Sequence, residues 1–217
     1  MERIIPAIIP QSLDHLRDTF LTIVPPAHEV QIDIVDGKFV PFTSWPYRGS
    51  GSVMLLREFC DVAVVEVDLM IQSPEVAIPL YVSAGVQKVV VHLETVRDFE
   101  EIVRHRDAHG YELGISVSNT TPLAVLTSAC SNVEYVQLMG IHDIGSQGQP
   151  FDTEVLERIK YLKNLFPELI ISIDGSVNEK TIPLLLEAGA DRFVSGSAIL
   201  NADDPRVQFE RLRTLVS

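Results

Sequence analysis

The feature of this sequence that most limits its fold is a regular alternation of short apolar segments with longer amphipathic ones. Eight short segments are rich in Val and Ile, which is typical of strands buried on both faces of a parallel sheet. These predicted strands are Ile4–Ile9, Val30–Val35, Val62–Met70, Lys88–His92, Glu112–Val117, Tyr135–Met139, Ile170–Asp174 and Arg192–Ser195.

The segments between the predicted strands carry helix signals. Apolar residues at helical spacing follow Ser12 until Pro25-Pro26 ends the pattern, and Ser73-Pro74 reads as an N-cap followed by Pro at the first helical position. Further helices are predicted for Thr153–Phe166, for Asn178–Ala188 before Gly189, and after Pro205. Each strand is thus followed by a crossover segment, as parallel strands require.

Eight strand–helix units in sequence predict a single (β/α)8 barrel, a TIM barrel of α/β class, because eight is the number of parallel strands that closes a barrel. The chain has 217 residues, enough for one such domain, and no linker divides it, so we expect one domain over residues 1–217. An open, doubly wound sheet is the structural alternative.

Charge and composition exclude several functions. The net charge of −13 disfavours nucleic acid and anionic membrane surfaces as partners. No apolar stretch reaches the roughly 18 residues of a membrane span, and no signal peptide is evident, so we expect a cytoplasmic protein. Cys60 and Cys130 are far apart in the sequence and are interpreted as buried packing residues.

Carboxylates stand at the ends of several predicted strands. Gln31 and Asp33 are two residues apart and share one face of a strand, while Asp68 and Asp174 lie near the ends of the third and seventh. A single terminal Asp often only caps a turn. Three on different strands favour a common site, because the carboxyl ends of barrel strands carry the active site in this fold.

Glycine-rich turns follow the last three strands. Glycine lets backbone N–H groups approach and surround an anion, so these turns predict a phosphate site; the alternative is that they only make tight turns. The candidate phosphate-binding residues are Gly145, Ser146, Gly148, Gly175, Ser176, Gly196 and Ser197.

Several motifs, in order along essentially the whole chain, resemble the ribulose-phosphate 3-epimerase family. The most specific is the segment Asp33-Ile-Val-Asp36-Gly37-Lys38-Phe39-Val40-Pro41, which resembles "D-x-M-D-G-x-F-V-P". Further matches are Val91-His92-Leu93-Glu94, Asn119–Leu123, Gly148–Phe151, Asp174-Gly175-Ser176-Val177-Asn178, Ala188–Asp191 and Gly196-Ser197-Ala198-Ile199.

The resemblance implies an isomerase that converts D-ribulose 5-phosphate to D-xylulose 5-phosphate by proton transfer at C3. Asp33 and Asp174 match the family's two catalytic aspartates, which face opposite sides of the substrate. Epimerisation needs an acid and a base on opposite faces, which agrees with two carboxylates. The resemblance also implies a divalent metal cation that stabilises the enediolate, and assembly into a homo-oligomer.

The sequence departs from the family at the metal site. Gln31 and Asp68 occupy the positions of its two histidine ligands, so the implied metal set is Asp33, Asp68, Asp174 and Gln31. An all-oxygen set favours Mg²⁺ or Mn²⁺ over Zn²⁺ or Fe²⁺. Without a cation, clustered carboxylates raise one another's pKa values, so either a metal binds, one Asp is protonated, or the site has diverged. His142 is an alternative ligand, and His92 is interpreted as a wall or core residue.

The leading hypothesis is therefore a ketose-phosphate 3-epimerase whose partner is a small phosphorylated sugar. One alternative is another sugar-phosphate epimerase or lyase on the same barrel. The sequence Glu66-Val-Asp68 lacks the third-strand Asp-x-Lys pattern of related decarboxylases, which counts against the nearest lyase. The other alternative is a sugar-phosphate-binding homologue without turnover. Trp45 and Tyr47 lie in the loop after the second predicted strand. They are expected either to be exposed, at an interface or in an active-site lid, or to pack on their own barrel.

Overall fold

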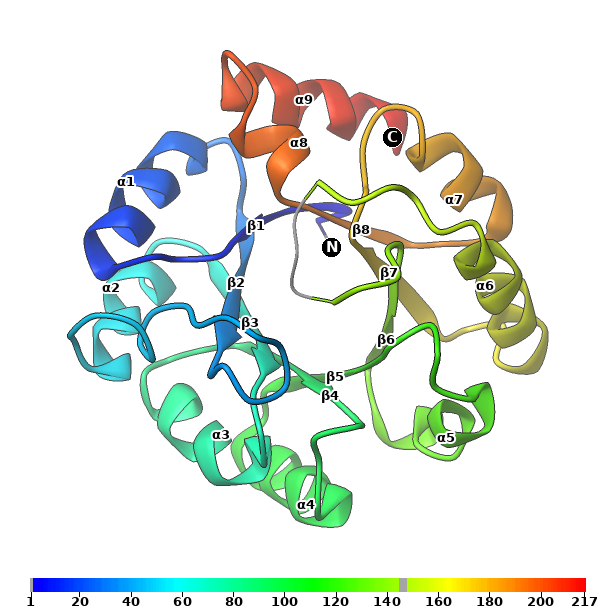
Figure 1. Ribbon diagram of the computed structural model, residues 1–217, viewed down its shortest axis with the longest axis horizontal. Coiled ribbons are helices and arrows are strands. Elements are labelled where there is room, and N and C mark those ends of the chain that lie inside the picture. Colours follow the sequence, from blue (N-terminus) through cyan, green and yellow to red (C-terminus); the bar gives the residue numbers. More distant parts are fainter. Residues whose placement is uncertain (1, 145–147) are drawn as a thin grey trace.

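Eight parallel strands form a closed barrel in the computed structural model, which describes residues 2–144 and 148–217. Each strand is hydrogen-bonded to the next, and the eighth is hydrogen-bonded to the first (Figure 1). The strands are β1 (Ile4–Ile8), β2 (Glu29–Val35), β3 (Val64–Met70), β4 (Lys88–His92), β5 (Glu112–Val117), β6 (Tyr135–Met139), β7 (Ile170–Asp174) and β8 (Arg192–Ser195). The predicted TIM barrel is confirmed, and the open sheet is excluded.

Helices surround the barrel as an outer ring (Figure 1). They are α1 (Leu13–Ile23), α2 (Arg57–Cys60), α3 (Pro74–Ser83), α4 (Phe99–His109), α5 (Leu123–Thr127), α6 (Glu154–Leu165), α7 (Ile182–Ala188), α8 (Ser197–Leu200) and α9 (Pro205–Leu215), with short 3-10 turns at Val53–Leu56 and Cys130–Asn132. The large hydrophobic core lies between this ring and the strands, and Leu16, Phe20, Ile159 and Leu212 are among the helix residues that fill it.

Two helix starts differ from the sequence-based expectation. Ser73 does precede α3, but its backbone is left-handed (φ 56°) and its side chain makes no capping hydrogen bond. Helix α7 begins at Ile182 rather than Asn178, because the Thr181 hydroxyl donates to the carbonyl of Ser176 and closes a separate turn before the helix. Ser12 caps α1 as predicted and accepts a hydrogen bond from the backbone N–H of His15.

Alternation along the strands gives the barrel an unusually polar interior. The odd-numbered residues of β2 are Glu29, Gln31, Asp33 and Val35, whereas Val30, Ile32 and Ile34 belong to the large core outside the sheet. Bulky branched residues fill the interior of most such barrels. Here the only apolar cluster among the inward residues of β1 and β8, within the described ranges, is the small group Ile5, Ala7 and Val194.

A charged layer fills the amino-terminal end of this interior. The Arg192 guanidinium contacts Glu29 (2.5 Å) and Glu66 (3.0 Å) and stacks over the Tyr135 ring, and Lys88 lies 3.0 Å from Glu29. The Tyr135 hydroxyl donates a hydrogen bond to Glu66. Burial raises the pKa of Glu66, and Arg192 opposes that rise. Cations therefore balance the carboxylates beneath the candidate site.

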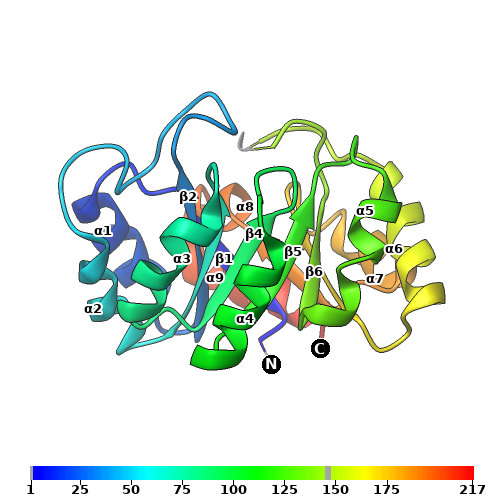
Figure 2. The same ribbon diagram turned by 90° about the horizontal axis from the view of Figure 1, so that it is seen from below.

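The two ends of the barrel differ in the loops that they carry. The long connections after β2 and β6 rise over the carboxyl ends of the strands, and the chain termini lie at the opposite end (Figure 2). The first of these connections is anchored by Trp45, which is completely buried and donates from Nε1 to the carbonyl of Ser50. Of the alternatives for Trp45, packing on its own barrel is the one that the structure shows, whereas Tyr47 is half-exposed. None of the helices in the two described ranges is long and apolar enough to cross a membrane.

Replacing Arg192 by Met tests the charged layer. The variant would leave Glu29 and Glu66 buried beside a neutral side chain, and removing one partner of such a network costs about 3–5 kcal/mol. We expect urea unfolding to show a loss of that size. The control is Arg104→Met, whose exposed ion pairs with Asp98 and Glu100 should change the unfolding free energy by less than about 1 kcal/mol. Equal effects of the two substitutions would contradict this account.

Candidate active site

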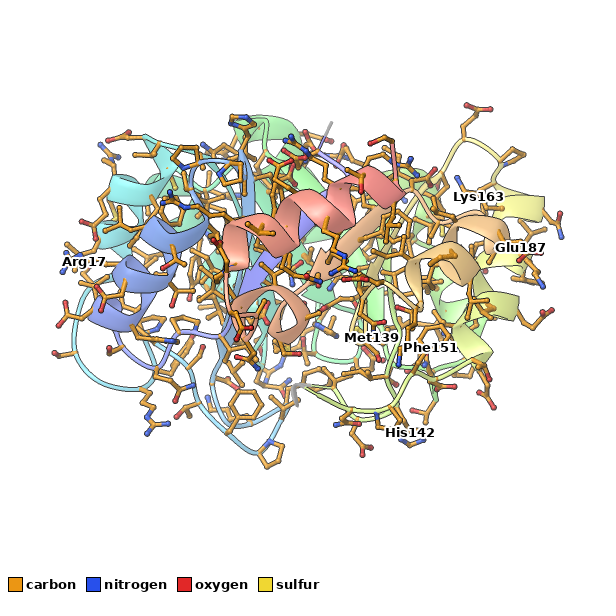
Figure 3. All side chains as sticks on the ribbon, turned by 90° about the horizontal axis from the view of Figure 1, so that it is seen from above. Arg17, Met139, His142, Phe151, Lys163 and Glu187 are labelled. Atoms are coloured by element: carbon orange, nitrogen blue, oxygen red, sulfur yellow. The ribbon has the colours of Figure 1, made fainter. Side chains whose placement is uncertain are left out.

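A cavity of about 240 Å³ opens at the carboxyl ends of the strands. Asp33 and Asp174 both line it, together with the small side chain of Ala7 and the apolar side chains of Met70 and Met139. In Figure 3 Met139 lies nearer the middle of the molecule than His142, which lies at the lower edge of the view. The two aspartates that the sequence analysis named as catalytic therefore contact the same cavity.

The strand register explains how the carboxylates meet. Asp33 on β2 is level with Asp68 on β3, and Asp174 on β7 is level with Val194 on β8. Strands β8 and β1 separate β7 from β2 around the barrel. Val194 on β8 and Ala7 on β1 are apolar residues that line the cavity between the two aspartates. Asp33 and Asp174 thus approach this cavity from different sides.

Asp33 is buried and held by its neighbours. Its Oδ1 accepts a hydrogen bond from the Gln31 Nε2 at 2.9 Å, and its backbone carbonyl accepts one from the Ser44 hydroxyl at 2.8 Å. Burial raises the pKa of the Asp33 carboxyl well above its usual range, and the charges of Asp174 and Asp68 raise it further, while the Gln31 hydrogen bond opposes the shift. Asp33 therefore retains its proton more readily than an exposed aspartate does.

Asp174 has a different environment. Burial and the nearby charge of Asp68 raise its pKa to about 7, while His92, the backbone N–H of Gly175 and the Gln31 side chain favour the ionised form. A pKa near neutrality suits a general acid or base, since both protonation states are then populated. Perturbed carboxyls that share a cavity are typical of functional sites.

Asp68 lies deeper and does not line the cavity. Its Oδ1 is 3.0 Å from His92 Nε2, and its Oδ2 accepts a hydrogen bond from Gln137 Nε2 at 2.8 Å. All three side chains are fully buried. Burial alone lowers the pKa of His92, but the charge and hydrogen bond of Asp68 outweigh it and raise that pKa. The His92 imidazole and the Asp68 carboxyl therefore form a buried hydrogen-bonded pair.

Sequence reasoning missed the roles of His92 and Gln137. His92 was interpreted only as a wall or core residue, and Gln137 was not singled out. The signal was the strand period: Tyr135, Gln137 and Met139 share one face of β6, and a polar residue on a face that points into a barrel needs a partner.

The implied metal set does not fit a divalent cation as these side chains are arranged. In the described part of the chain, no group of three or more His, Cys, Asp or Glu side chains is arranged to hold a metal ion. Both oxygens of Asp68 face hydrogen-bonding nitrogens, and Gln31 turns its amide nitrogen to Asp33. His142, the alternative ligand, is exposed and pairs with Asp143.

Most of the candidate phosphate-binding residues line the cavity. They are Gly148, Gly175, Ser176, Gly196 and Ser197. Gly145 and Ser146 lie outside the described residues. Val177, Asn178 and Ala198 also line the cavity and were not named from the sequence.

The turn after β7 requires its glycine. Gly175 has a φ of 95°, and a Cβ there would lie 2.7 Å from the Ile141 side chain. The Ser195 hydroxyl donates to the carbonyl of Val177, which fixes the end of the same turn. The turns after β7 and β8 are thus held together, and a rigid turn can present its backbone N–H groups to an anion without reorganising.

The pH dependence of the unfolding free energy tests the raised pKa of the Asp174 carboxyl. Because the Asp174 pKa is near 7 in the folded protein and near 3.8 in an unfolded chain, the native state binds the extra proton and the unfolding free energy falls as pH rises from about 4 to 7. Asp174→Asn removes this loss. We expect the variant to be more stable than the parent by about 1–2 kcal/mol at pH 8 and similar to it near pH 4, measured by urea unfolding with chelator present.

The exposed Asp61 offers a matched control for that measurement. Asp61→Asn should follow the parent at both pH values. A parent protein whose stability stays constant between pH 4 and 8, or an Asp174→Asn variant that is less stable at pH 8, would contradict the assigned carboxyl environment.

Comparison with solved structures agrees with the fold. A 3-hexulose-6-phosphate synthase superposes with a TM-score of 0.74 at 18% identity, covering 99% of this chain and 100% of that one. A 3-keto-L-gulonate-6-phosphate decarboxylase from Vibrio cholerae O1 gives a TM-score of 0.76 at 14% identity, covering 99% and 96%. At these identities the similarity shows the barrel fold alone.

Comparison with sequences is more specific. The profile of the ribulose-phosphate 3 epimerase family matches residues 3–200. The ribulose-phosphate 3-epimerase of Bacillus subtilis is 32% identical over 189 residues, 85% of each chain, and that of Mycobacterium bovis is 31% identical over 214 residues, covering 97% of this chain and 91% of that one. The expectation of an isomerase-type enzyme of carbohydrate metabolism is thereby confirmed. The chain belongs to the ribulose-phosphate 3-epimerase family.

Proposed function

We propose that this protein interconverts D-ribulose 5-phosphate and D-xylulose 5-phosphate by proton transfer at C3. The observation that carries the proposal is the pair Asp33 and Asp174, a buried carboxyl from β2 and a partly buried one from β7 that line one cavity and have raised pKa values. The names of the relatives support the substrate.

The chemistry needs one ionised and one protonated carboxyl. The ionised group removes the proton from C3, and the electrons of the C–H bond form the C2–C3 double bond of an enediolate. The other carboxyl then returns a proton to C3 on the opposite face, and the ketone re-forms. Two mutually repelling carboxyls favour this arrangement, because the charge of one raises the pKa of the other.

The phosphate group would occupy the glycine-lined side of the cavity. Gly148, Gly175, Ser176, Gly196 and Ser197 lie on that side, and such turns can offer backbone N–H donors to an anion. Local donors are needed, since a protein with a net charge of −13 repels an anionic substrate at long range. The cavity of about 240 Å³ suits a small ligand, because it lies below the roughly 300–1,000 Å³ of drug-sized pockets.

The environment of the third strand argues against a decarboxylase of the related kind. Asp68 holds His92 and Gln137 through its two oxygens, and the nearest residues along β3 on the same face are Glu66 and Met70. No lysine therefore stands on this face of β3 to act on a carboxylate or an enediolate. Epimerisation remains the chemistry that fits Asp33 and Asp174 best.

Replacement of Asp33 by Asn tests the assignment. The amide cannot accept the C3 proton, so kcat for ribulose 5-phosphate should fall by about 100- to 10,000-fold while the fold is retained. A coupled epimerisation assay measures the rate, and circular dichroism verifies the fold. Asp61→Asn, at an exposed position, should keep the parent rate. Parental activity in Asp33→Asn would exclude this residue from the reaction.

Isotope exchange separates the two carboxyls. In D₂O each single variant keeps one acid–base group, so one of Asp33→Asn and Asp174→Asn should exchange the C3 proton of ribulose 5-phosphate only, and the other that of xylulose 5-phosphate only. NMR reads the exchange directly. Loss of both exchanges in either variant would contradict a two-carboxyl mechanism, and tight sugar-phosphate binding by the parent without turnover would support a binding protein instead.

A further inference from the structure

We propose that hydrogen bonds from Gln31, His92 and Gln137 take the place of a divalent cation in this site, so that the three carboxylates are held without a metal. The catalytic consequence, epimerisation that does not depend on a cation, rests on the proposed function. The binding consequence, that the native chain holds no divalent cation here, stands independently of it.

The first support is the environment of Asp68. This residue occupies one of the two positions where the family resemblance implies a histidine ligand. Its Oδ1 lies 3.0 Å from His92 Nε2, and its Oδ2 accepts from Gln137 Nε2 at 2.8 Å. A cation bound to Asp68 would have to use carboxylate lone pairs that point away from His92 and Gln137. Asp68, His92 and Gln137 are all fully buried, so that cation would also be buried. The contacts with His92 and Gln137 satisfy both oxygens of this buried carboxylate.

The second support is the direction of the Gln31 amide. Gln31 stands at the other histidine position and is level with Ala7 of β1. Its Nε2 donates to Asp33 Oδ1 at 2.9 Å and also favours the ionised form of Asp174. A metal ligand presents an oxygen lone pair to the cation, whereas Gln31 turns its amide nitrogen to Asp33. Gln31 thus fixes the position of the Asp33 carboxyl.

The third support is that the change at Asp68 is matched by a residue on the neighbouring strand. Asp68 is negative where an imidazole was implied, and the imidazole of His92 lies on the neighbouring strand within hydrogen-bonding distance of it. The Phe39 ring covers His92, with centroids 5.2 Å apart. In the described residues no group of three or more His, Cys, Asp or Glu side chains converges as a metal site would. His92 and Gln137 are therefore positioning residues, which act through Asp68.

Metal content is the first test. The native protein is incubated separately with Mg²⁺, Mn²⁺, Zn²⁺ and Fe²⁺, freed of unbound ion by gel filtration, and analysed by mass spectrometry of the elements. We expect no stoichiometric metal. Epimerase activity should be the same before and after treatment with a chelator. One tightly bound cation per chain, or activity that a chelator removes and a cation restores, would overturn the inference.

The double substitution Gln31→His and Asp68→His provides the positive control for metal binding. It restores two imidazoles beside Asp33 and Asp174, and imidazole with carboxylate is a ligand set that suits zinc. We expect the double variant to retain Zn²⁺ when the parent does not. A parent that retains Zn²⁺ as well as the double variant does would contradict the inference. A parent that is free of metal yet inactive on ribulose 5-phosphate would overturn the proposed function and leave the metal-free site supported.

The positioning role of His92 has its own readout. His92→Leu removes the donor to Asp68, and His92→Gln restores an N–H at that place. We expect kcat to fall roughly 10- to 100-fold in the first variant with KM little changed, and to recover partly in the second. His28→Leu, at an exposed position before β2, is the control and should keep the parent rate. Equal losses in the Leu and Gln variants, or an increase in KM alone, would contradict the role.

Discussion

The constraint on which this structure depends is the closure of eight parallel strands, which sends every second side chain of each strand into a confined interior. In this chain that interior is largely polar. Along β2 the inward residues begin with Glu29, Gln31 and Asp33, and along β3 they are Glu66 and Asp68. Because buried carboxylates are stable only when paired or protonated, each must find a partner on another strand. The chemistry at the mouth of the barrel follows from how those partners are distributed.

The partners are distributed unequally between the two ends. At the amino-terminal end, Arg192 and Lys88 lie within ion-pairing distance of Glu29, and Arg192 also contacts Glu66. At the carboxyl end, the His92 imidazole contacts Asp68, whereas in the described part of the chain no Lys or Arg forms an ion pair with Asp33 or Asp174. The uncompensated pair is therefore the one that opens to the cavity, where raised pKa values make proton transfer near neutral pH feasible.

The sequence was sufficient to predict the barrel, because five of its eight strands have the bounds that the apolar segments indicate, from Lys88–His92 to Arg192–Ser195. It also predicted that Asp33 and Asp174 share a site, since both lie in the carboxyl-terminal half of a strand. It could not show that Asp68 turns away from the cavity, because that depends on His92 and Gln137 arriving from β4 and β6. The sequence left the burial of Trp45 open for a similar reason: that burial depends on how the loop after β2 folds back on the barrel, which no local pattern encodes.

Gln31 and Asp68 stand where the family resemblance implies histidine ligands, and each takes part in hydrogen bonds inside the barrel. Substituting a carboxylate for an imidazole in a crowded acidic site adds repulsion, unless another group supplies positive charge. The strand register makes His92 available for this, because it lies two residues beyond Val90, the residue level with Asp68 on β4. The Gln31 amide reaches Asp33 because the two residues share one face of β2. Gln31 and Asp68 are therefore compatible with the pair Asp33 and Asp174 at the cavity, because Gln31 holds Asp33 there and Asp68 is held away from the cavity by His92 and Gln137.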